Sequence, residues 1–205
     1  MEVVIDSYER ELERYGSLNI NNSESLFTTD STLILQILSN AEVKGDHLLQ
    51  CAILGVHLLV ESFDLSLTEK NEFFSYLSYG FREEFSANST AAKKQLGEKY
   101  RNYRSMLWQV VPGPPKDPFL KEILPLYQGW QNSMKESIRK IAGLKEKRQL
   151  EIDPYDLLAS YIHMHLNRLF DNNQRLSEMV VYDLLNQHYR SLAAIKKSNK
   201  MHLQI

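Results

Sequence analysis

A run of apolar residues between Leu48 and Val60 is the feature that most limits what this chain can fold into. The run belongs to a stretch from Asp46 to Glu61 whose apolar residues cover almost the whole surface of a helix, so a helix there must be deeply buried. The run contains His57 and is far shorter than the ~20 residues that a bilayer requires. We therefore expect a helical protein built around this segment, without a membrane span.

Helical spacing of apolar residues extends along most of the chain, and one segment interrupts it. Residues 112–118 hold four prolines, which remove backbone donors and disfavour helix at the residue before them. We therefore predict an internal loop at 112–118 within a single domain over residues 1–205. The apolar pattern predicts about seven helices, over residues 30–38, 46–61, 68–81, 91–111, 119–150, 154–170 and 176–196.

The N-terminal residues have a different pattern. Only residues 2–14 look extended, with the apolar side chains of Val3 and Ile5 on one face, so we predict a strand there. A strand without a partner exposes unpaired backbone groups. We therefore expect the protein to associate, as a homo- or hetero-oligomer, through Val3 to Leu12.

Composition excludes a few classes of protein. The net charge of −2 gives no basic field that would favour nucleic acid. The single cysteine, Cys51, cannot form an internal disulfide, and its place in the apolar run predicts a buried, inert thiol. The sequence has no signal-peptide pattern, so we expect a cytoplasmic protein.

The segment from Ser160 to Phe170 places two histidines, an asparagine and an arginine inside an apolar helical pattern. Asp153 is the expected N-cap of this helix, because a proline follows it. At about 100° per residue, His163 and His165 point roughly 160° apart. A shared metal ion is not expected, because a His-x-His pair diverges on a helix.

The two histidines have different predicted roles. His165 falls within the apolar stripe of the helix, so we predict a packed histidine with one hydrogen bond. His163 falls on the flank with Asp156 and Asn167, where a carboxylate could fix its tautomer and the amide could hold a substrate group. His163 is therefore the candidate for proton transfer. On this stretch alone, however, the pattern favours the alternative that both histidines are satisfied core residues.

A second unusual stretch is YERELERYG at residues 8–16. Alone, such a charge-alternating stretch is most simply a solvated face. In order and spacing, this stretch, FTTDS at 27–31 and IHMHLNRL at 162–169 resemble the C-terminal domain of lantibiotic dehydratases, also called the thiopeptide-type bacteriocin biosynthesis domain. The resemblance runs from about Glu9 to about Tyr189, and its specific motifs occupy the two ends.

This resemblance implies the second half of peptide dehydration in lanthipeptide biosynthesis. Glutamate is removed by β-elimination from glutamylated Ser or Thr of a ribosomally made precursor peptide, which gives dehydroalanine or dehydrobutyrine. By the family's motif, Arg14 stabilises the developing charge and Glu11 orients the Arg14 side chain. His163 is the acid or base. Asn167 supports His163, and Arg168 is a structural ion pair or a substrate clamp. No cofactor and no metal are implied.

The resemblance also implies partners and a fold. The partners are the precursor peptide, an upstream glutamyl-tRNA-dependent glutamylating domain or protein, and a lanthionine cyclase. Family members carry, before the Glu-Arg-Tyr-Gly motif, a sheet-forming segment whose arginines line the same site, and no such strand is found in this sequence. We therefore predict a mainly α chain, the helical portion of an α+β elimination domain, acting within a split or larger dehydratase.

Two other functions stay open at this point. Thiopeptide pyridine synthases resemble the same domain but join two dehydroalanines by a formal cycloaddition. The intact motif from Glu11 to Gly16 favours elimination, because binding a glutamyl group needs its arginine. The third interpretation is a noncatalytic domain that only binds the precursor peptide or a partner enzyme, and the missing arginine strand favours it.

Overall fold

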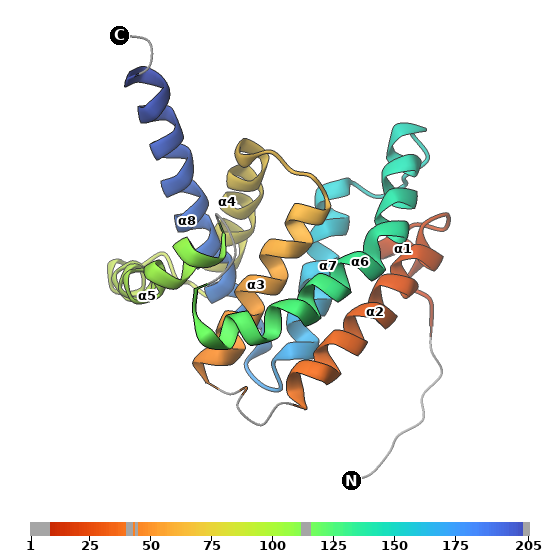
Figure 1. Ribbon diagram of the computed structural model, residues 1–205. Helices are drawn as coiled ribbons and strands as arrows, with labels where there is room; N and C mark the ends of the chain where they lie inside the picture. The colour runs from red at the N-terminus through yellow and green to blue at the C-terminus, as the bar shows by residue number, and fades with distance from the viewer. Residues whose placement is uncertain (1–8, 40–42, 44, 112–115, 203–205) are drawn as a thin grey trace.

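All the regular structure in the described part of the chain is helical. The computed structural model describes residues 9–39, 43, 45–111 and 116–202. Its eight helices are α1 (Leu12–Tyr15), α2 (Ile20–Leu38), α3 (Asp46–Ser62), α4 (Leu67–Glu84), α5 (Thr90–Val110), α6 (Pro118–Glu146), α7 (Pro154–Leu169) and α8 (Gln174–His202), shown in Figure 1. Among these described helices, none is both long and apolar enough to cross a membrane.

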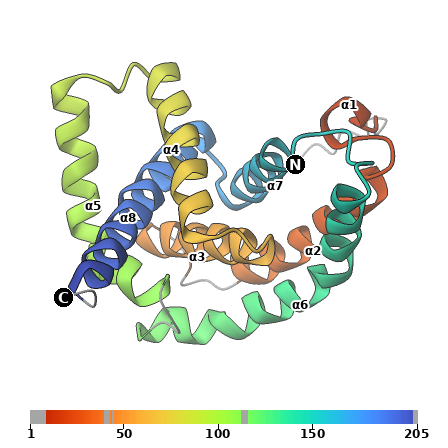
Figure 2. The same cartoon turned by 90° about the horizontal axis from the view of Figure 1, so that it is seen from above.

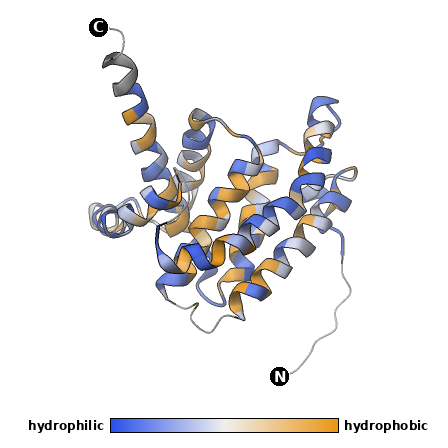
Figure 3. Cartoon of the chain, viewed as in Figure 1, coloured by the Kyte–Doolittle hydropathy of each residue, from blue (hydrophilic) through white to orange (hydrophobic). Residues whose placement is uncertain are grey.

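Helix α3 is the centre of the fold, as the apolar run predicts. Every residue from Cys51 to His57 is buried, and α3 contacts α5, α6, α7 and α8. Figure 3 shows hydrophobic residues concentrated along α3 and on the helix faces around it. The predicted burial of Cys51 is confirmed, and burial raises the pKa of its free thiol to about 12.

Two groups of helices flank α3 and α7 (Figure 2). On one side α2 packs against α6, with α1 at the start of α2, and on the other side α4 packs against α8, with α5 beside α8. Helix α7 lies between the two groups and contacts α1, α2, α3 and α8. One face of α7 therefore lies between α1 and α8.

The predicted N-terminal strand is wrong. Residues 1–8 lie outside the described residues, but residues 9 and 10 are not in a strand and Leu12–Tyr15 form one helical turn. The turn ends at Gly16, whose N–H donates to the carbonyl of Leu12 at 2.8 Å. Burial of Tyr15 stabilises this turn. The alternating charges along the sequence did not indicate that burial. The described residues therefore support a mainly α chain, without the strand or the sheet of an α+β fold, and the expected edge-strand association loses its basis.

Helix α2 begins about ten residues earlier than predicted, at Ile20 rather than Asp30. Its first half is rich in Asn, Ser and Thr, which favour caps and turns over helix interiors. Burial overrides this preference, since Ile20 and Leu26 lie in the core. Asp30 is consequently not an N-cap but a buried residue in the middle of α2.

The predicted loop at 112–118 is too long at its C-terminal end. Residues 112–115 lie outside the described residues, but Asp117 accepts from the backbone N–H of Leu120 and Pro118 is the first residue of α6. Proline suits this position because the first turn of a helix needs no partner for its N–H. The other predicted helices are present, with ends that differ by several residues, and Asp153 caps α7 as predicted.

Candidate functional site

Tyr15 anchors α1 to the rest of the protein. Its ring is buried and stacks on Tyr161 of α7, with ring centroids 5.9 Å apart, and meets Phe27 of α2 edge-on at 5.1 Å. Aromatic pairs at these separations add to the stability gained from burial alone. The tyrosine of the Glu-Arg-Tyr-Gly motif therefore holds the turn, and its arginine with it, against α7.

Gly16 and Ser17 fix the end of the same turn. Gly16 has φ +79°, in the region that favours glycine, and a Cβ there would lie 3.2 Å from Oε2 of Glu151. The N–H and the hydroxyl of Ser17 both donate to the Glu151 carboxylate, at 2.6 and 2.5 Å. These bonds tie the exit from α1 to the segment that precedes α7.

Arg14 extends from this turn towards α7. Its Nε donates to Oγ of Ser160 at 3.2 Å, and its Nη1 lies 3.9 Å from Oε2 of Glu11. The Arg14 side chain is 37% exposed. The guanidinium is thus oriented by α7 and by Glu11, while part of it faces solvent.

His163 lies on the same face of α7, one turn after Ser160. Its Nδ1 lies 3.0 Å from Oε2 of Glu178, and its Nε2 lies 2.9 Å from Nδ2 of Asn167. The His163 side chain is 21% exposed, so the ring is partly accessible. The predicted carboxylate partner exists, but it comes from Glu178 on α8, whereas Asp156 is exposed.

Glu178 is buried and contacts three side chains. Besides His163, it accepts from Nη1 of Arg175 at 3.1 Å and from the hydroxyl of Tyr182 at 2.7 Å. Arg175 in turn pairs with Glu84 of α4. Burial raises the pKa of Tyr182 well above its ordinary value, so its hydroxyl remains a donor.

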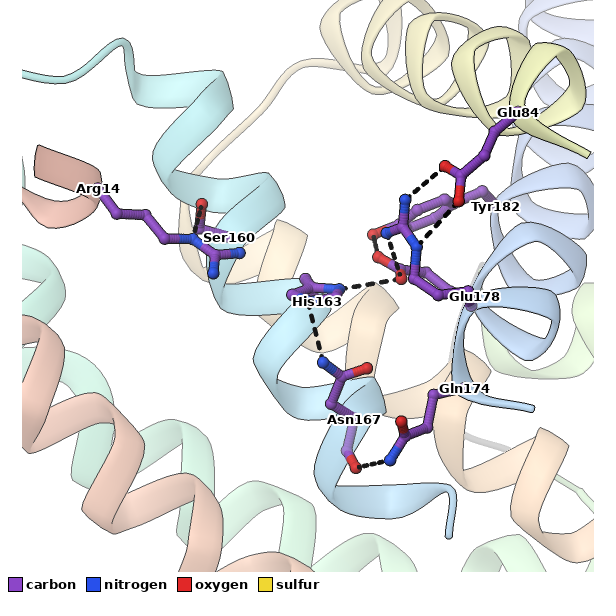
Figure 4. Close-up of polar contacts among 9 residues, drawn as sticks. Arg14, Glu84, Ser160, His163, Asn167, Gln174, Glu178 and Tyr182 are labelled. Atoms are coloured by element: carbon purple, nitrogen blue, oxygen red, sulfur yellow. Dashed lines mark hydrogen bonds and ion pairs between the residues drawn. The ribbon is translucent and has the colours of Figure 1, made fainter. Parts of the chain in front are cut away.

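Figure 4 shows Arg14 reaching α7 from α1 and Glu178 reaching it from α8. Ser160, His163 and Asn167 are spaced three and four residues apart, which places them on one helix face. This face therefore brings together four of the predicted site residues, namely Arg14 with Glu11, and His163 with Asn167.

Arg168 and His165 share Asp30 as a partner in a separate cluster, in which His165 is buried and Arg168 is partly exposed. Its Nη1 is 3.0 Å from Oδ2 of Asp30, while Nδ1 of His165 is 2.7 Å from Oδ1 of the same carboxylate. The ring of His165 also stacks on Trp130 at 5.3 Å. The predicted packed histidine with one hydrogen bond is confirmed. Arg168 makes an ion pair with Asp30, and both roles considered for it stay predictions.

Glu178, Arg175 and Tyr182 were missed by sequence reasoning. Their spacing of three and four residues puts them on one face of α8, which was the available signal. That signal does not say which helix the face meets. Glu178, which is 1% exposed, can be identified as a site residue only from the packing of α8 against α7.

An imidazole bound to a buried carboxylate, with a guanidinium on the same helix face, suits proton transfer beside developing negative charge. The sequence model of the family described as Lantibiotic biosynthesis dehydratase C-term matches residues 1–189, and the chain belongs to that family. The resemblance seen in the motifs is therefore confirmed.

A similar protein is the subtilin biosynthesis protein SpaB of Bacillus subtilis. The two sequences are 25% identical over 206 residues, which cover 93% of this chain and 18% of SpaB. The chain thus spans less than a fifth of the length of this curated relative. No solved structure matches the chain.

Proposed function

We propose that this chain catalyses the elimination half of peptide dehydration in lanthipeptide biosynthesis. Its substrate is a precursor peptide with glutamylated Ser or Thr, and its products are glutamate and dehydroalanine or dehydrobutyrine. Family membership over residues 1–189 supports dehydration chemistry. The observation that carries the finer assignment is the placement of Arg14 and His163 on one face of α7, through Ser160.

The elimination needs one proton transfer and one departing carboxylate. The Cα–H bond of the modified residue breaks, and its electron pair forms the Cα=Cβ double bond while the Cβ–O bond breaks. The bonding electrons of Cβ–O leave with the carboxylate of glutamate. Negative charge develops on the neighbouring peptide carbonyl oxygen and on the leaving group, so a nearby cation stabilises the transition state.

Arg14 takes the electrostatic role in this proposal. A guanidinium can grip a carboxylate with two parallel hydrogen bonds, and the partly exposed side chain of Arg14 leaves donors available for a substrate. Glu11 orients it from the preceding turn. His163 is the acid or base, and Asn167 supports it through the contact at Nε2. Arg168 contributes through its ion pair with Asp30.

The proposed partners follow from this role. A glutamyl-tRNA-dependent glutamylating domain or protein must supply the glutamylated peptide, and a lanthionine cyclase would consume the dehydrated one. Because SpaB is much longer than this chain, we propose that the elimination domain works within a larger or split dehydratase. We expect these steps to occur in the cytoplasm.

The test separates ester formation from elimination. In a system reconstituted with the glutamylating partner, Arg14→Ala should leave glutamylation intact and block loss of glutamate, so that glutamylated precursor accumulates and is visible by mass spectrometry. Arg14→Lys should restore little of the elimination, because an ammonium group cannot form two parallel hydrogen bonds to a carboxylate. Arg10→Ala, which removes an arginine paired with Glu24 at the surface, is the matched control and should permit dehydration.

Other outcomes of this experiment contradict the proposal. Fully dehydrated product from Arg14→Ala would remove Arg14 from the mechanism. Unmodified precursor would place Arg14 in peptide binding or folding. A wild-type chain that leaves glutamylated peptide unchanged but converts a peptide with two dehydroalanines into a pyridine would identify a cycloaddition enzyme, and a chain that only binds either peptide would be noncatalytic.

A further inference from the structure

The two nitrogens of the His163 ring meet partners of different chemistry. Nδ1 lies 3.0 Å from Oε2 of Glu178, and an ionised carboxylate can only accept a hydrogen bond. Arg175 and Tyr182 also use Glu178 as an acceptor, so all three contacts suit the ionised form. Nδ1 therefore carries a hydrogen whether the ring is neutral or protonated. Nε2 is consequently the nitrogen that gains and loses a proton.

The terminal amide of Asn167, which faces Nε2, can either donate a hydrogen bond through Nδ2 or accept one through Oδ1. Its Nδ2 lies 2.9 Å from Nε2 of His163, which suits a neutral ring that accepts at Nε2. Its Oδ1 is buried without a hydrogen-bond partner among the described residues. When Nε2 is protonated it needs an acceptor, and a half turn of the terminal amide brings Oδ1 to that place.

We propose that Glu178 and Asn167 are positioning residues for His163: Glu178 holds the hydrogen on Nδ1 so that Nε2 exchanges the proton, and the Asn167 amide reverses when Nε2 becomes protonated. That this proton comes from the glutamylated residue of the substrate rests on the elimination proposed above. The tautomer itself is a property of the free chain. It can therefore be measured without substrate.

Other charged groups around His163 do not replace Glu178. Arg175 from α8 lies behind the carboxylate and is itself paired with Glu84 of α4. Arg14 from α1 is held on Ser160, one turn away along α7. Asp156 of α7 is exposed to solvent. Among the described residues, Glu178 is the carboxylate in contact with the His163 ring.

The direct test is the tautomer of His163 in the full chain labelled with ¹⁵N-histidine. The chain has six histidines, and the His163 signals are those lost in His163→Gln. Long-range ¹H–¹⁵N spectra at a pH where the ring is neutral should show a protonated Nδ1 and an unprotonated Nε2. Glu178→Leu removes the acceptor and should move the hydrogen to Nε2, whereas Glu84→Gln, which alters a carboxylate that does not touch His163, should preserve the wild-type tautomer.

Asn167→Asp tests the second half of the proposal. Aspartate offers a fixed acceptor at Nε2, so His163 should show two protonated nitrogens under conditions where the wild-type ring is neutral. If Glu178→Leu does not fold, Glu178→Gln keeps the shape of the side chain and removes its charge. The new amide can donate as well as accept at Nδ1, so in Glu178→Gln the tautomer with its hydrogen on Nε2 should appear in the same spectra.

The outcomes separate this proposal from the proposed function. A wild-type His163 with its hydrogen on Nε2 would overturn the role of Glu178 even if elimination is observed. A Glu178→Gln protein whose His163 keeps its hydrogen on Nδ1 alone would also overturn it. An Nδ1-protonated ring that responds to the variants as described supports the positioning roles, and absence of elimination from the same wild-type protein would then count against the proposed function alone.

Discussion

Among the glycines that the structure describes, Gly55 in the middle of α3 is expected to be the least replaceable. A Cβ built at Gly55 would lie 2.2 Å from Nε2 and 2.8 Å from Cε1 of His165, distances that no native packing permits. The ring has no room to retreat. It is 1% exposed, bonded to Asp30 at 2.7 Å and stacked on Trp130 at 5.3 Å.

The cost of Gly55→Ala can be estimated from these contacts. Forcing extra volume into a packed core costs about 1–3 kcal/mol. If the ring yields, the buried bond between His165 and Asp30 is broken, which costs about 1–3 kcal/mol more. We therefore expect a loss of roughly 2–6 kcal/mol, seen in urea or thermal denaturation followed by circular dichroism.

Three further variants make this prediction specific. Gly80→Ala and Gly129→Ala place a methyl group in open space within helices, so they should keep or slightly raise stability through higher helix propensity. Adding His165→Ala to Gly55→Ala removes the obstructing ring, so the double variant should lose less stability than the sum of the single losses. A Gly55→Ala protein as stable as the wild type, or strict additivity in the double variant, would refute the reasoning.

Three more predictions concern stability. Burial lowers the pKa of His57 and of His188 from 6.5 to about 4, so the folded state resists protonation and stability should fall as the pH drops from about 6.5 to 4, by up to about 3 kcal/mol per histidine, in denaturation curves measured across this range. His163→Gln should abolish elimination with little change in melting temperature, whereas His165→Ala should lose roughly 1–3 kcal/mol on thermal unfolding. Gly16→Ala should cost about 1–2 kcal/mol by the same measurement, because φ is +79° there.

Much of the candidate site was accessible from the sequence because helical geometry is regular. The opposite directions of His163 and His165 follow from two residues of helical rotation, and the structure has one ring at a partly exposed face and the other in the core. The pairing of His163 with Asn167 follows from a spacing of four residues. Arg14 and Glu11 came from the family motif, and their roles remain predictions.

The carboxylate partners could not be read from the sequence. Asp156 lies on the correct flank of α7 but is exposed, while Glu178, fifteen residues beyond His163, supplies the contact. Asp30 was predicted to cap a helix and instead binds the buried His165 and the partly exposed Arg168. In each case the partner belongs to another helix, so helix packing rather than local spacing selects it.

The sequence by itself determined the features that depend on local periodicity and on burial of apolar surface. These are the central helix from Asp46 to Ser62, the cap at Asp153, and the separation of the two histidines. The tertiary structure alone decided that Leu12–Tyr15 form a helical turn rather than a strand, because burial of Tyr15 against α7 outweighs the local charge pattern. It also brought α1 and α8 to the same face of α7, since contacts between distant segments depend on how whole helices fill space together.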